Sequence, residues 1–393
     1  AVPRPDPVAP AAAEVAALAD LVRAAGRPVF VAGRGCREPG AGEAVARAAE
    51  AAGALLATSA VANGLYAGHP WGLGISGGFA SPPAAELIAG ADLVVGWGCA
   101  LNMWTTRHGA LVAAARVAQV DDRPDALGAQ RPVDLGVVGD VTLTADALTA
   151  ALATHPRPGS GYRGAGTAAV LAGGIGWADR PVGTGPTADP VPLPDGADAP
   201  DRIDPAVLSV ALDGLLPAER VVAVDSGNFM GHPTAYLGVP DLDGYCLTQG
   251  FQSIGLGLAT AIGCAVARPD RLPVAAVGDG GFLMGVAELD TVRRLGLAMV
   301  VVIYDDDAYG AEIHHFGPDH HDLATVTFPE TDLAAVARGF GLEAVTVRRP
   351  GDLAPLRDWL TAWRHGRPRP AMVIDAKVTR EAAWWLEEAF RGH

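Results

Sequence analysis

Two short acidic segments carry the residue types best suited to hold a metal ion beside a phosphate. A Gly-Asp-Gly turn occupies 278–280, and three consecutive aspartates follow at 305–307, after a spacer of 24 residues. Glycine lets the backbone approach a phosphate closely. Carboxylates that face a phosphate need a cation between them, and oxygen ligands beside phosphate suit Mg²⁺. The pattern predicts a magnesium and phosphate site, and an acidic turn after a core strand is the alternative without function.

The elements around these two segments place them at one edge of a sheet. Residues 272–277 form an apolar run that ends at glycine, and 299–304 is apolar and β-branched, which is typical of buried parallel strands. Between them, 282–295 spaces its apolar residues like one face of a helix. Such a unit crosses over right-handed, so both acidic segments follow the carboxyl ends of parallel strands. Open α/β sheets bind their ligands at that edge.

Composition narrows the classes of function. The chain has 393 residues, half of them hydrophobic, which suffices for two or three domains with sizeable cores. A net charge of −15 disfavours nucleic acid and anionic membrane as partners. Four cysteines without a C-x-x-C pair suggest neither a zinc site nor a disulfide framework. Since no apolar run reaches the length of a membrane helix and the start lacks signal-peptide anatomy, we expect a cytoplasmic protein.

Strand and helix patterns alternate in two regions of the chain. We interpret 1–12 as a linker, 13–154 as a first domain, 155–202 as a Pro- and Gly-rich linker and 203–393 as a second domain. The alternation predicts two α/β domains, each a doubly wound parallel sheet. We expect strands at 28–32, 55–58, 91–96, 116–120, 221–224, 272–277, 299–304, 344–347 and 371–374. We expect helices at 13–25, 42–53, 84–89, 110–115, 146–154, 250–263, 282–295 and 381–390.

The unit around the two acidic segments resembles the thiamine-diphosphate-binding motif, in which Gly-Asp-Gly is followed by Asn-Asn after a spacer of this length. The whole second domain resembles the diphosphate-binding domain of the acetolactate synthase and pyruvate decarboxylase superfamily. The resemblance implies that thiamine diphosphate binds together with Mg²⁺. It assigns the metal to the side chains of Asp279 and Asp306 and to the carbonyl of Ala308, and the diphosphate to backbone N–H groups of Gly280 and Gly281.

This chain departs from the family pattern in the second acidic segment. Asp305 and Asp306 stand where the family carries two asparagines. An aspartate at the second position still supplies an oxygen to magnesium. It also adds negative charge near a diphosphate, so we expect cofactor affinity to depend more strongly on the metal.

Further cofactor contacts are implied by the same resemblance. Ile254 falls where the family wedges an apolar side chain between the two cofactor rings, and Gln252 falls where a backbone carbonyl accepts a hydrogen bond from the cofactor's amino group. The polar segment 225–228 falls where family members place a short turn that contacts the diphosphate, and an ordinary turn or helix cap is the alternative. For Ile254, the alternative is ordinary packing in the core. The cofactor-binding residues implied here, beyond those already given, are Asn228, Gln252, Ser253, Ile254, Tyr309 and Gly310.

Catalytic candidates come directly after the second acidic segment. Pyruvate and indolepyruvate decarboxylases carry a glutamate at the position of Glu312, whereas acetolactate synthases usually carry an apolar residue there. Glu312 is therefore a candidate proton relay to the carbanion or enamine that decarboxylation produces. His314 and His315 are further candidates, with a surface turn as the alternative.

The first domain resembles the central domain of the same superfamily. Some family members bind FAD in this domain, and oxalyl-CoA decarboxylases bind ADP. Residues 101–104, Leu-Asn-Met-Trp, are similar to the Leu-Asn-Trp of the CoA-using members. Many central domains bind no ligand, so FAD or ADP here is the less favoured expectation.

The family carries a third, pyrimidine-binding domain, for which this chain has no counterpart. The resemblance implies a separate partner chain that supplies it, in a hetero-oligomer such as a dimer of heterodimers, or else a fragment of a longer protein. Carboligation of a 2-keto acid, as in acetolactate synthase, is the first expectation, with simple decarboxylation close behind. The alternatives are cleavage or formation of a 2-hydroxyacyl-CoA and a non-catalytic regulatory or scaffold subunit.

Overall fold

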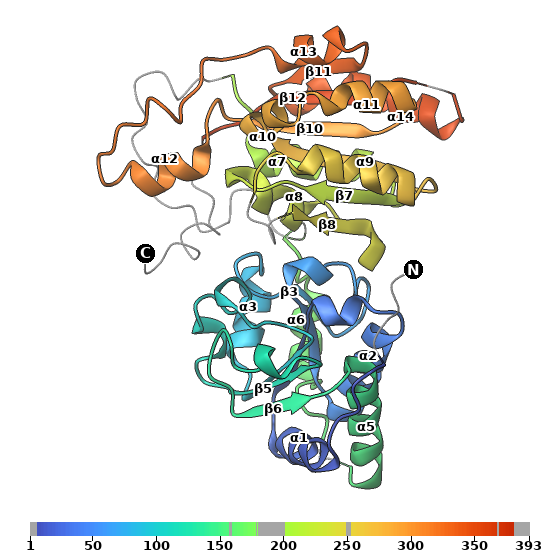
Figure 1. Ribbon diagram of the computed structural model, residues 1–393, viewed down its shortest axis with the longest axis vertical. Helices are drawn as coiled ribbons and strands as arrows, with labels where there is room; N and C mark the ends of the chain where they lie inside the picture. The colour runs from blue at the N-terminus through green and yellow to red at the C-terminus, as the bar shows by residue number, and fades with distance from the viewer. Residues whose placement is uncertain are drawn as a thin grey trace. The chain divides into compact units, whose positions relative to one another are not determined.

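The computed structural model describes residues 6–156, 159–177, 179, 201–248, 253–367 and 369–380. The chain divides into two compact units, Ala1–Asp179 and Arg180–His393, and each is described here by itself. Each unit contains a six-stranded sheet with parallel strand pairs and flanking helices (Figure 1). The predicted fold class, two α/β domains with parallel sheets, is confirmed.

The first unit is built around a sheet with the strand order β3-β2-β1-β4-β5-β6. Its central strands are short apolar runs that are buried along their whole length, as expected for a sheet covered on both faces. The strands are β1 Pro28–Ala32, β2 Leu55–Thr58, β3 Gly72–Ile75, β4 Leu93–Trp97, β5 Arg116–Asp121 and β6 Leu135–Val138. The helices are α1 Ala12–Ala24, α2 Ala41–Ala52, α3 Pro82–Ala89, α4 Met103–Thr106, α5 Val141–Thr154 and α6 Ala165–Ala172.

Helices cover both faces of this sheet. Buried side chains of α1, α2 and α5 pack with alternate residues of the strands in one apolar cluster. The other alternate residues pack with α3, and Leu171 of α6 lies against that second cluster. Helix α6 and Tyr162, whose hydroxyl donates to the Leu87 carbonyl at 2.8 Å, lie within the segment 155–202 that we interpret as a linker.

The second unit has the strand order β11-β12-β10-β9-β7-β8. The strands are β7 Arg220–Val224, β8 Tyr245–Leu247, β9 Leu272–Gly278, β10 Val300–Asp305, β11 Glu343–Val347 and β12 Met372–Lys377. The helices are α7 Pro205–Leu215, α8 Gly231–Tyr236, α9 Gly257–Ala267, α10 Asp279–Met284, α11 Glu288–Leu295, α12 Gly310–Phe316, α13 Leu333–Gly339 and α14 Ala354–Arg364.

The two faces of the second sheet bury different helices. Helices α9, α10, α11 and α13 share one apolar cluster with alternate residues of β7, β9, β10 and β12. Helix α7 lies on the opposite face. Its Ser209 hydroxyl is 2.8 Å from the hydroxyl of Tyr304 on β10. Tyr304 points away from the cluster just described, because its neighbour Ile303 belongs to that cluster and side chains alternate along a strand. The Asp204 carboxylate caps the N-terminus of α7 by accepting hydrogen bonds from two backbone N–H groups.

The strand order creates a switch point between β7 and β9. The chain leaves β7 for the edge strand β8 and then returns to the other side of β7 as β9. Connections from the two neighbours therefore run in opposite directions, and open α/β sheets bind ligands at the carboxyl ends of the strands at such a point. The Gly-Asp-Gly turn begins there.

Several element predictions need correction. The predicted helix at 282–295 is two helices, because Gly285 ends α10 and the chain turns before α11 begins at Glu288. The predicted helix at 250–263 begins only at Gly257, and 249–252 lie outside the described residues. Residues 110–115 form only a short 3₁₀ turn, Ala110–Val112. The predicted helix at 381–390 lies outside the described residues.

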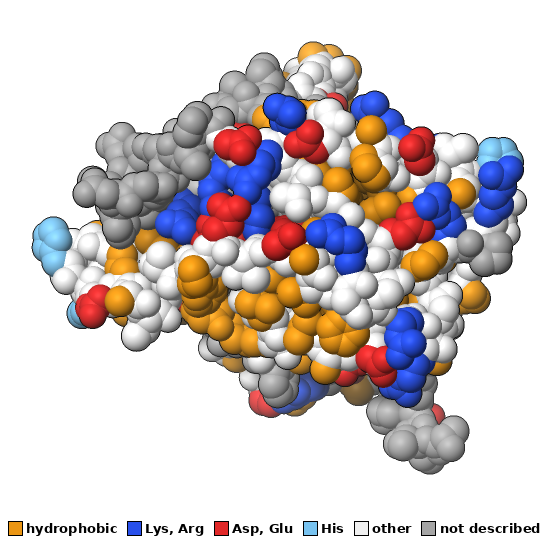
Figure 2. All heavy atoms as spheres, turned by 90° about the horizontal axis from the view of Figure 1, so that it is seen from above, with side chains coloured by type: hydrophobic (Ala, Val, Ile, Leu, Met, Phe, Trp, Pro, Cys, Tyr) orange, Lys and Arg blue, Asp and Glu red, His pale blue; other side chains and the backbone are white. Residues whose placement is uncertain are grey.

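No helix within the described residues is long and apolar enough to cross a membrane. On the face drawn in Figure 2, acidic and basic side chains lie next to one another instead of forming one field of a single sign. Many charged side chains of the described residues form ion pairs, such as Arg293 with Asp290 on α11.

Candidate functional site

The carboxyl ends of three neighbouring strands bring the two acidic segments together. Strand β9 pairs with β10 so that Tyr304 lies opposite Gly278, and β7 pairs with β9 on its other side. Asp225 follows β7, Asp279 follows β9, and Asp306 follows β10. The side chains of Asp279 and Asp306 thus leave adjacent strands at the same edge of the sheet.

Asp279 joins the two acidic segments directly. It begins α10 and is only 5% exposed. One carboxylate oxygen accepts a hydrogen bond from the backbone N–H of Ala308 at 3.0 Å, and the other accepts from Gly280 at 2.9 Å. Burial, followed by the neighbouring charges of Asp306 and Asp305, raises the pKa of the Asp279 carboxyl well above its usual range.

Asp306 lies beside Asn228 and Gly310. A methyl group on Gly310 would overlap the Asp306 carboxylate and would also lie 3.1–3.2 Å from the Asn228 side chain. Asp306 is 7% exposed, and burial, only partly offset by Arg380, raises its pKa to about 7. Its carboxylate is thus buried at a convergence of three segments that are distant in sequence.

Asp225 holds the glycine-rich segment against the strand ends. It is fully buried, and its carboxylate accepts hydrogen bonds from the backbone N–H groups of Gly255 and Ser226, both at 2.8 Å. Gly255 has φ +87°, a conformation that favours glycine. Asp225 was no part of the predicted site, although an aspartate directly after a buried strand was a signal that could have found it.

Tyr309, Ser253 and Ile254 are further predicted cofactor contacts. Tyr309 lies over Gly280, because a methyl group there would overlap its ring, and Phe328 packs edge-on against Tyr309 with ring centroids 4.8 Å apart. Ser253 and Ile254 are half-buried, so Ile254 is no fully buried core residue. Gln252 lies outside the described residues.

The three catalytic candidates lie on the short helix α12. Glu312 is exposed in its first turn, Ile313 is buried, and His314 and His315 are half-buried. The two ends of the segment that contains α12 are joined by backbone hydrogen bonds. The Tyr309 N–H donates to the Val326 carbonyl, and the Phe328 N–H donates to the Asp307 carbonyl. Helix α12 therefore begins beside the acidic site, directly after Tyr309.

Three cations that the sequence did not single out surround the acidic loop. Lys377 at the end of β12 forms a buried ion pair with Asp305. Arg202 and Arg380 both form ion pairs with Asp307. Arg202 belongs to the segment that we interpreted as a linker. Three consecutive buried aspartates need nearby cations to offset their charge, but the residues that supply those cations are distant in the sequence.

The charge balance of the site fits a divalent cation. Within the described residues, neither Asp279 nor Asp306 forms an ion pair. The aspartates of the cluster outnumber its cations by two, since it combines Asp279, Asp305, Asp306, Asp307 and Asp375 with Lys377, Arg202 and Arg380. A bound Mg²⁺ would offset that excess and lower the desolvation penalty of both carboxylates.

The site is not a cage of side-chain ligands. The described residues contain no group of three or more His, Cys, Asp or Glu side chains placed to hold a metal ion. The predicted set differs from such a cage because it has two carboxylates and one backbone carbonyl, that of Ala308. Octahedral Mg²⁺ would take its remaining ligands from phosphate and water, as is usual for Mg²⁺ bound with a phosphorylated cofactor.

The corresponding edge of the first unit is closed by backbone contacts. The Gly35 N–H donates to the Gly98 carbonyl at 3.0 Å, which joins the loops after β1 and β4 at the switch point of that sheet. Leu101 is buried, and the Asn102 side chain caps α4 by accepting from the Thr105 N–H at 3.0 Å. The residues that resemble those of CoA-using members thus have structural tasks here.

Comparison with protein families identifies both units. A model described as the C-terminal, thiamine-pyrophosphate-binding domain of thiamine pyrophosphate enzymes matches 225–374, and the model of their central domain matches 15–148. The chain belongs to the thiamine-diphosphate-dependent enzymes. The predicted resemblance is confirmed, and the family's pyrimidine-binding domain is not detected in this sequence. The acidic loops of the site lie inside the segment that matches the family's binding domain.

Curated relatives of the chain are named as sulfoacetaldehyde acetyltransferases and acetolactate synthase large subunits. A sulfoacetaldehyde acetyltransferase of Roseovarius nubinhibens is 28% identical over 385 residues, which cover 95% of this chain and 62% of the relative. A putative acetolactate synthase large subunit of Mycobacterium tuberculosis is 29% identical, covering 81% and 55%. An acetolactate synthase large subunit of Parasynechococcus marenigrum is 27% identical, covering 88% and 53%. The chain therefore spans less than two thirds of the length of these relatives.

Proposed function

We propose that this chain is a component of a thiamine-diphosphate- and Mg²⁺-dependent enzyme that decarboxylates a 2-keto acid and ligates the remaining carbon unit to an acceptor. The observation that carries the proposal is the pair of buried carboxylates, Asp279 and Asp306, which leave adjacent strands without an ion-pair partner among the described residues. The family match supports a role for that pair in cofactor binding, because the family binds a cofactor with a diphosphate group.

The residues present would divide the binding of the cofactor among three segments. Asp279, Asp306 and the Ala308 carbonyl would hold Mg²⁺, while the backbone at Gly280 and Gly281 and the side chain of Asn228 would contact the diphosphate. When bound, thiamine diphosphate supplies the electron sink that accepts the electrons of the bond to CO₂. Asp225 positions the glycine-rich segment, so that Ile254 presents its apolar side chain to the cofactor.

Ligation is favoured over simple decarboxylation by the relatives, two of which are named for acetolactate synthase and one for acetyl transfer. Glu312 is the residue that would hold or deliver a proton, because it is exposed in the first turn of α12, next to the Gly310 backbone that contacts Asp306. Glu312→Gln is expected to lower turnover about a hundredfold without weakening cofactor binding. Equal losses in binding and turnover would contradict a proton-transfer role.

The partner chain is part of the proposal. We propose from the family resemblance that a partner chain with a pyrimidine-binding domain completes the cofactor site in a hetero-oligomer. Copurification of the tagged chain from its native cell tests this directly. If the chain alone released CO₂ from 2-keto acids at an enzymatic rate, the partner requirement would be wrong, although the cofactor assignment would stand.

Turnover tests the reaction itself. We would incubate the copurified assembly with thiamine diphosphate, Mg²⁺ and a panel of 2-keto acids that includes pyruvate, and measure both CO₂ and the condensation products. CO₂ with a condensed product is the expected result. Free aldehyde without condensation would replace ligation by simple decarboxylation, and turnover confined to 2-hydroxyacyl-CoA would select the acyl-CoA reaction. Cofactor binding without any turnover would favour a regulatory or scaffold subunit.

A further inference from the structure

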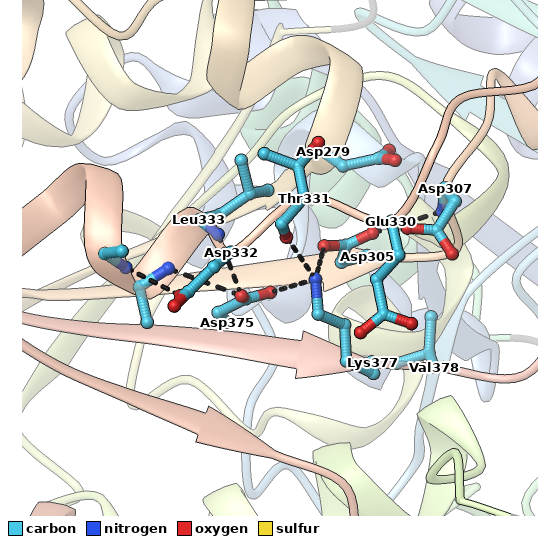
Figure 3. Close-up of polar contacts among 12 residues, drawn as sticks. Asp279, Asp305, Asp307, Glu330, Thr331, Asp332, Leu333, Asp375, Lys377 and Val378 are labelled. Carbon is cyan, nitrogen blue, oxygen red and sulfur yellow. Dashed lines mark hydrogen bonds and ion pairs between the residues drawn. The ribbon is translucent and has the colours of Figure 1, made fainter.

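Lys377 occupies a closed polar cage at the end of β12. Its side chain is about 2% exposed, and its ammonium contacts the Asp305 carboxylate, the Thr331 carbonyl at 2.6 Å and the Asp375 carboxylate at 3.3 Å. The ammonium donates hydrogen bonds to the Asp305 carboxylate and the Thr331 carbonyl, whereas Asp375 is an ion-pair contact. Figure 3 shows the Lys377 nitrogen at the meeting point of these three partners, with Asp279 outside the cage.

The second carboxylate of the cage has partners of its own. The other oxygen of Asp375 accepts hydrogen bonds from the backbone N–H groups of Leu333 and Ala334, at 3.1 and 3.3 Å, where α13 begins. Backbone donors and the helix terminus therefore stabilise the charge of Asp375. Lys377 therefore mainly neutralises Asp305, which forms no ion pair with any other cation within the described residues.

Asp305 in turn shapes the loop that carries Asp306. Its second carboxylate oxygen accepts the backbone N–H of Asp307 at 3.1 Å, and Asp307 has φ +54°, a backbone conformation uncommon for a residue with a side chain. Arg202 donates to the Asp305 carbonyl at 3.1 Å, and Arg380 donates to the Asp306 carbonyl. The backbone on both sides of Asp306 is thus held by charged groups.

We propose that Lys377 is the positioning residue of this loop: by pairing with Asp305 it neutralises the aspartate that replaces the family's first asparagine and orients Asp306 toward the metal. This inference rests on the proposed function, because it concerns how the loop is presented to Mg²⁺ and thiamine diphosphate. It also agrees with the expectation that the added charge near the diphosphate is that of Asp306. Of the two charges that the Asp-Asp sequence adds, Asp305 is neutralised within the protein, and only Asp306 acts on the cofactor site.

The inference is tested by a mutant cycle in the full chain, with its partner where one copurifies. Lys377→Met keeps the length of the side chain but leaves Asp305 buried without a cation, so the metal-free protein should melt roughly 10 °C lower. Its affinity for thiamine diphosphate with Mg²⁺ should fall at least about tenfold. Asp305→Asn in the Lys377→Met background removes the uncompensated charge and should restore most of both properties.

A control ion pair lies near the opposite end of β12. Arg369, which precedes β12, forms an ion pair with Glu343 at the start of β11, and both side chains are about one-third exposed. Arg369→Met should leave cofactor affinity unchanged. If Lys377→Met also left it unchanged, or if adding Asp305→Asn deepened its defects, the positioning role would be overturned.

The two readouts separate this inference from the function on which it rests. Melting of the metal-free variants needs no cofactor, so rescue of Lys377→Met by Asp305→Asn supports the coupling of the two residues on its own. Failure of the wild-type protein to bind thiamine diphosphate would overturn the proposed function instead. Wild-type binding combined with additive effects of the two substitutions, in melting and in affinity, would overturn only the role of Lys377.

Discussion

The two units of this protein share an architecture and differ in the loops at the carboxyl ends of their strands. Both contain six parallel strands with a switch point in the strand order. In the first unit, the loops at that point meet through glycine backbones, with the Gly35 N–H bonded to the Gly98 carbonyl. In the second unit, the loops carry Asp225, Asp279 and 305–307, all buried. The same fold therefore provides an edge closed by backbone contacts in one unit and an acidic edge in the other.

The comparison teaches that the chemistry resides in a few loop residues and their long-range partners. In the second unit, the cluster around the acidic loop combines five buried aspartates with three cations within the described residues. Such an arrangement is unfavourable unless a cation binds or carboxyl groups take up protons, so it indicates a site selected for binding instead of stability. The glycine contacts in the first unit have no comparable electrostatic penalty.

The largest effect is expected from removing the carboxylate that joins the two acidic segments. Asp279→Asn retains the shape of the side chain but loses a metal ligand, so the affinity for thiamine diphosphate with Mg²⁺ should fall at least about a hundredfold. The matched control is Asp140→Asn, because Asp140 also begins a helix directly after a strand, in the first unit. Calorimetric titration of both variants would contradict the account if they lost affinity equally.

A second pair of substitutions separates binding from stability. Gly310→Ala would push against the Asp306 carboxylate and should lower cofactor affinity about tenfold or more. Gly33→Ala would overlap the Gly98 carbonyl and should destabilise the first unit by about 1–3 kcal/mol, with little effect on affinity. Urea unfolding and calorimetry on both variants provide the test. A binding defect in Gly33→Ala would mean that the closed edge also takes part in the site.

An intermediate effect is expected at Asp225. Asp225→Ala removes the acceptor of the Gly255 and Ser226 N–H groups and leaves both without that partner, at a cost of about 1–3 kcal/mol in the free energy of unfolding. Cofactor affinity should fall as well, because the glycine-rich segment loses its anchor. Asp225→Asn keeps an acceptor oxygen and should lose less of both. Equal losses for the two variants would show that the negative charge, and not the hydrogen bonds, is what matters.

The smallest effect is expected in the first unit at Asn102. Its side chain caps α4, so Asn102→Ala should lower the free energy of unfolding by about 1 kcal/mol. Neither cofactor affinity nor turnover of 2-keto acids should change. Loss of acyl-CoA turnover in this variant, measured with the same protein, would revive the resemblance of 101–104 to CoA-using enzymes.

Much of the site was predictable because its residues come directly after strands that are evident as apolar runs. Strand β9 and the Gly-Asp-Gly turn after it agree with the prediction almost to the residue. The break between α10 and α11 was missed, because the apolar spacing of 282–295 continues across Gly285. Edge strands β3 and β8 were missed because they are short and carry little apolar periodicity.

The partners of the acidic loop could not have been placed from the sequence. Lys377 is 72 residues from Asp305, and the two meet only because β12 pairs with β10 in a register that sets them opposite each other. Arg202 precedes α7 and reaches the loop from 105 residues away. A run of buried aspartates indicates that cations must be near, but only the strand order identifies which ones.

Calorimetric titration of thiamine diphosphate into this chain, with and without Mg²⁺ and its copurified partner, tests the central claim most directly. We predict binding that requires Mg²⁺ and disappears in Asp279→Asn, whether the partner is needed or not. Binding that is indifferent to Mg²⁺, or an absence of binding to wild-type protein in every combination, would contradict the claim that the acidic edge of the second unit is a metal-dependent cofactor site.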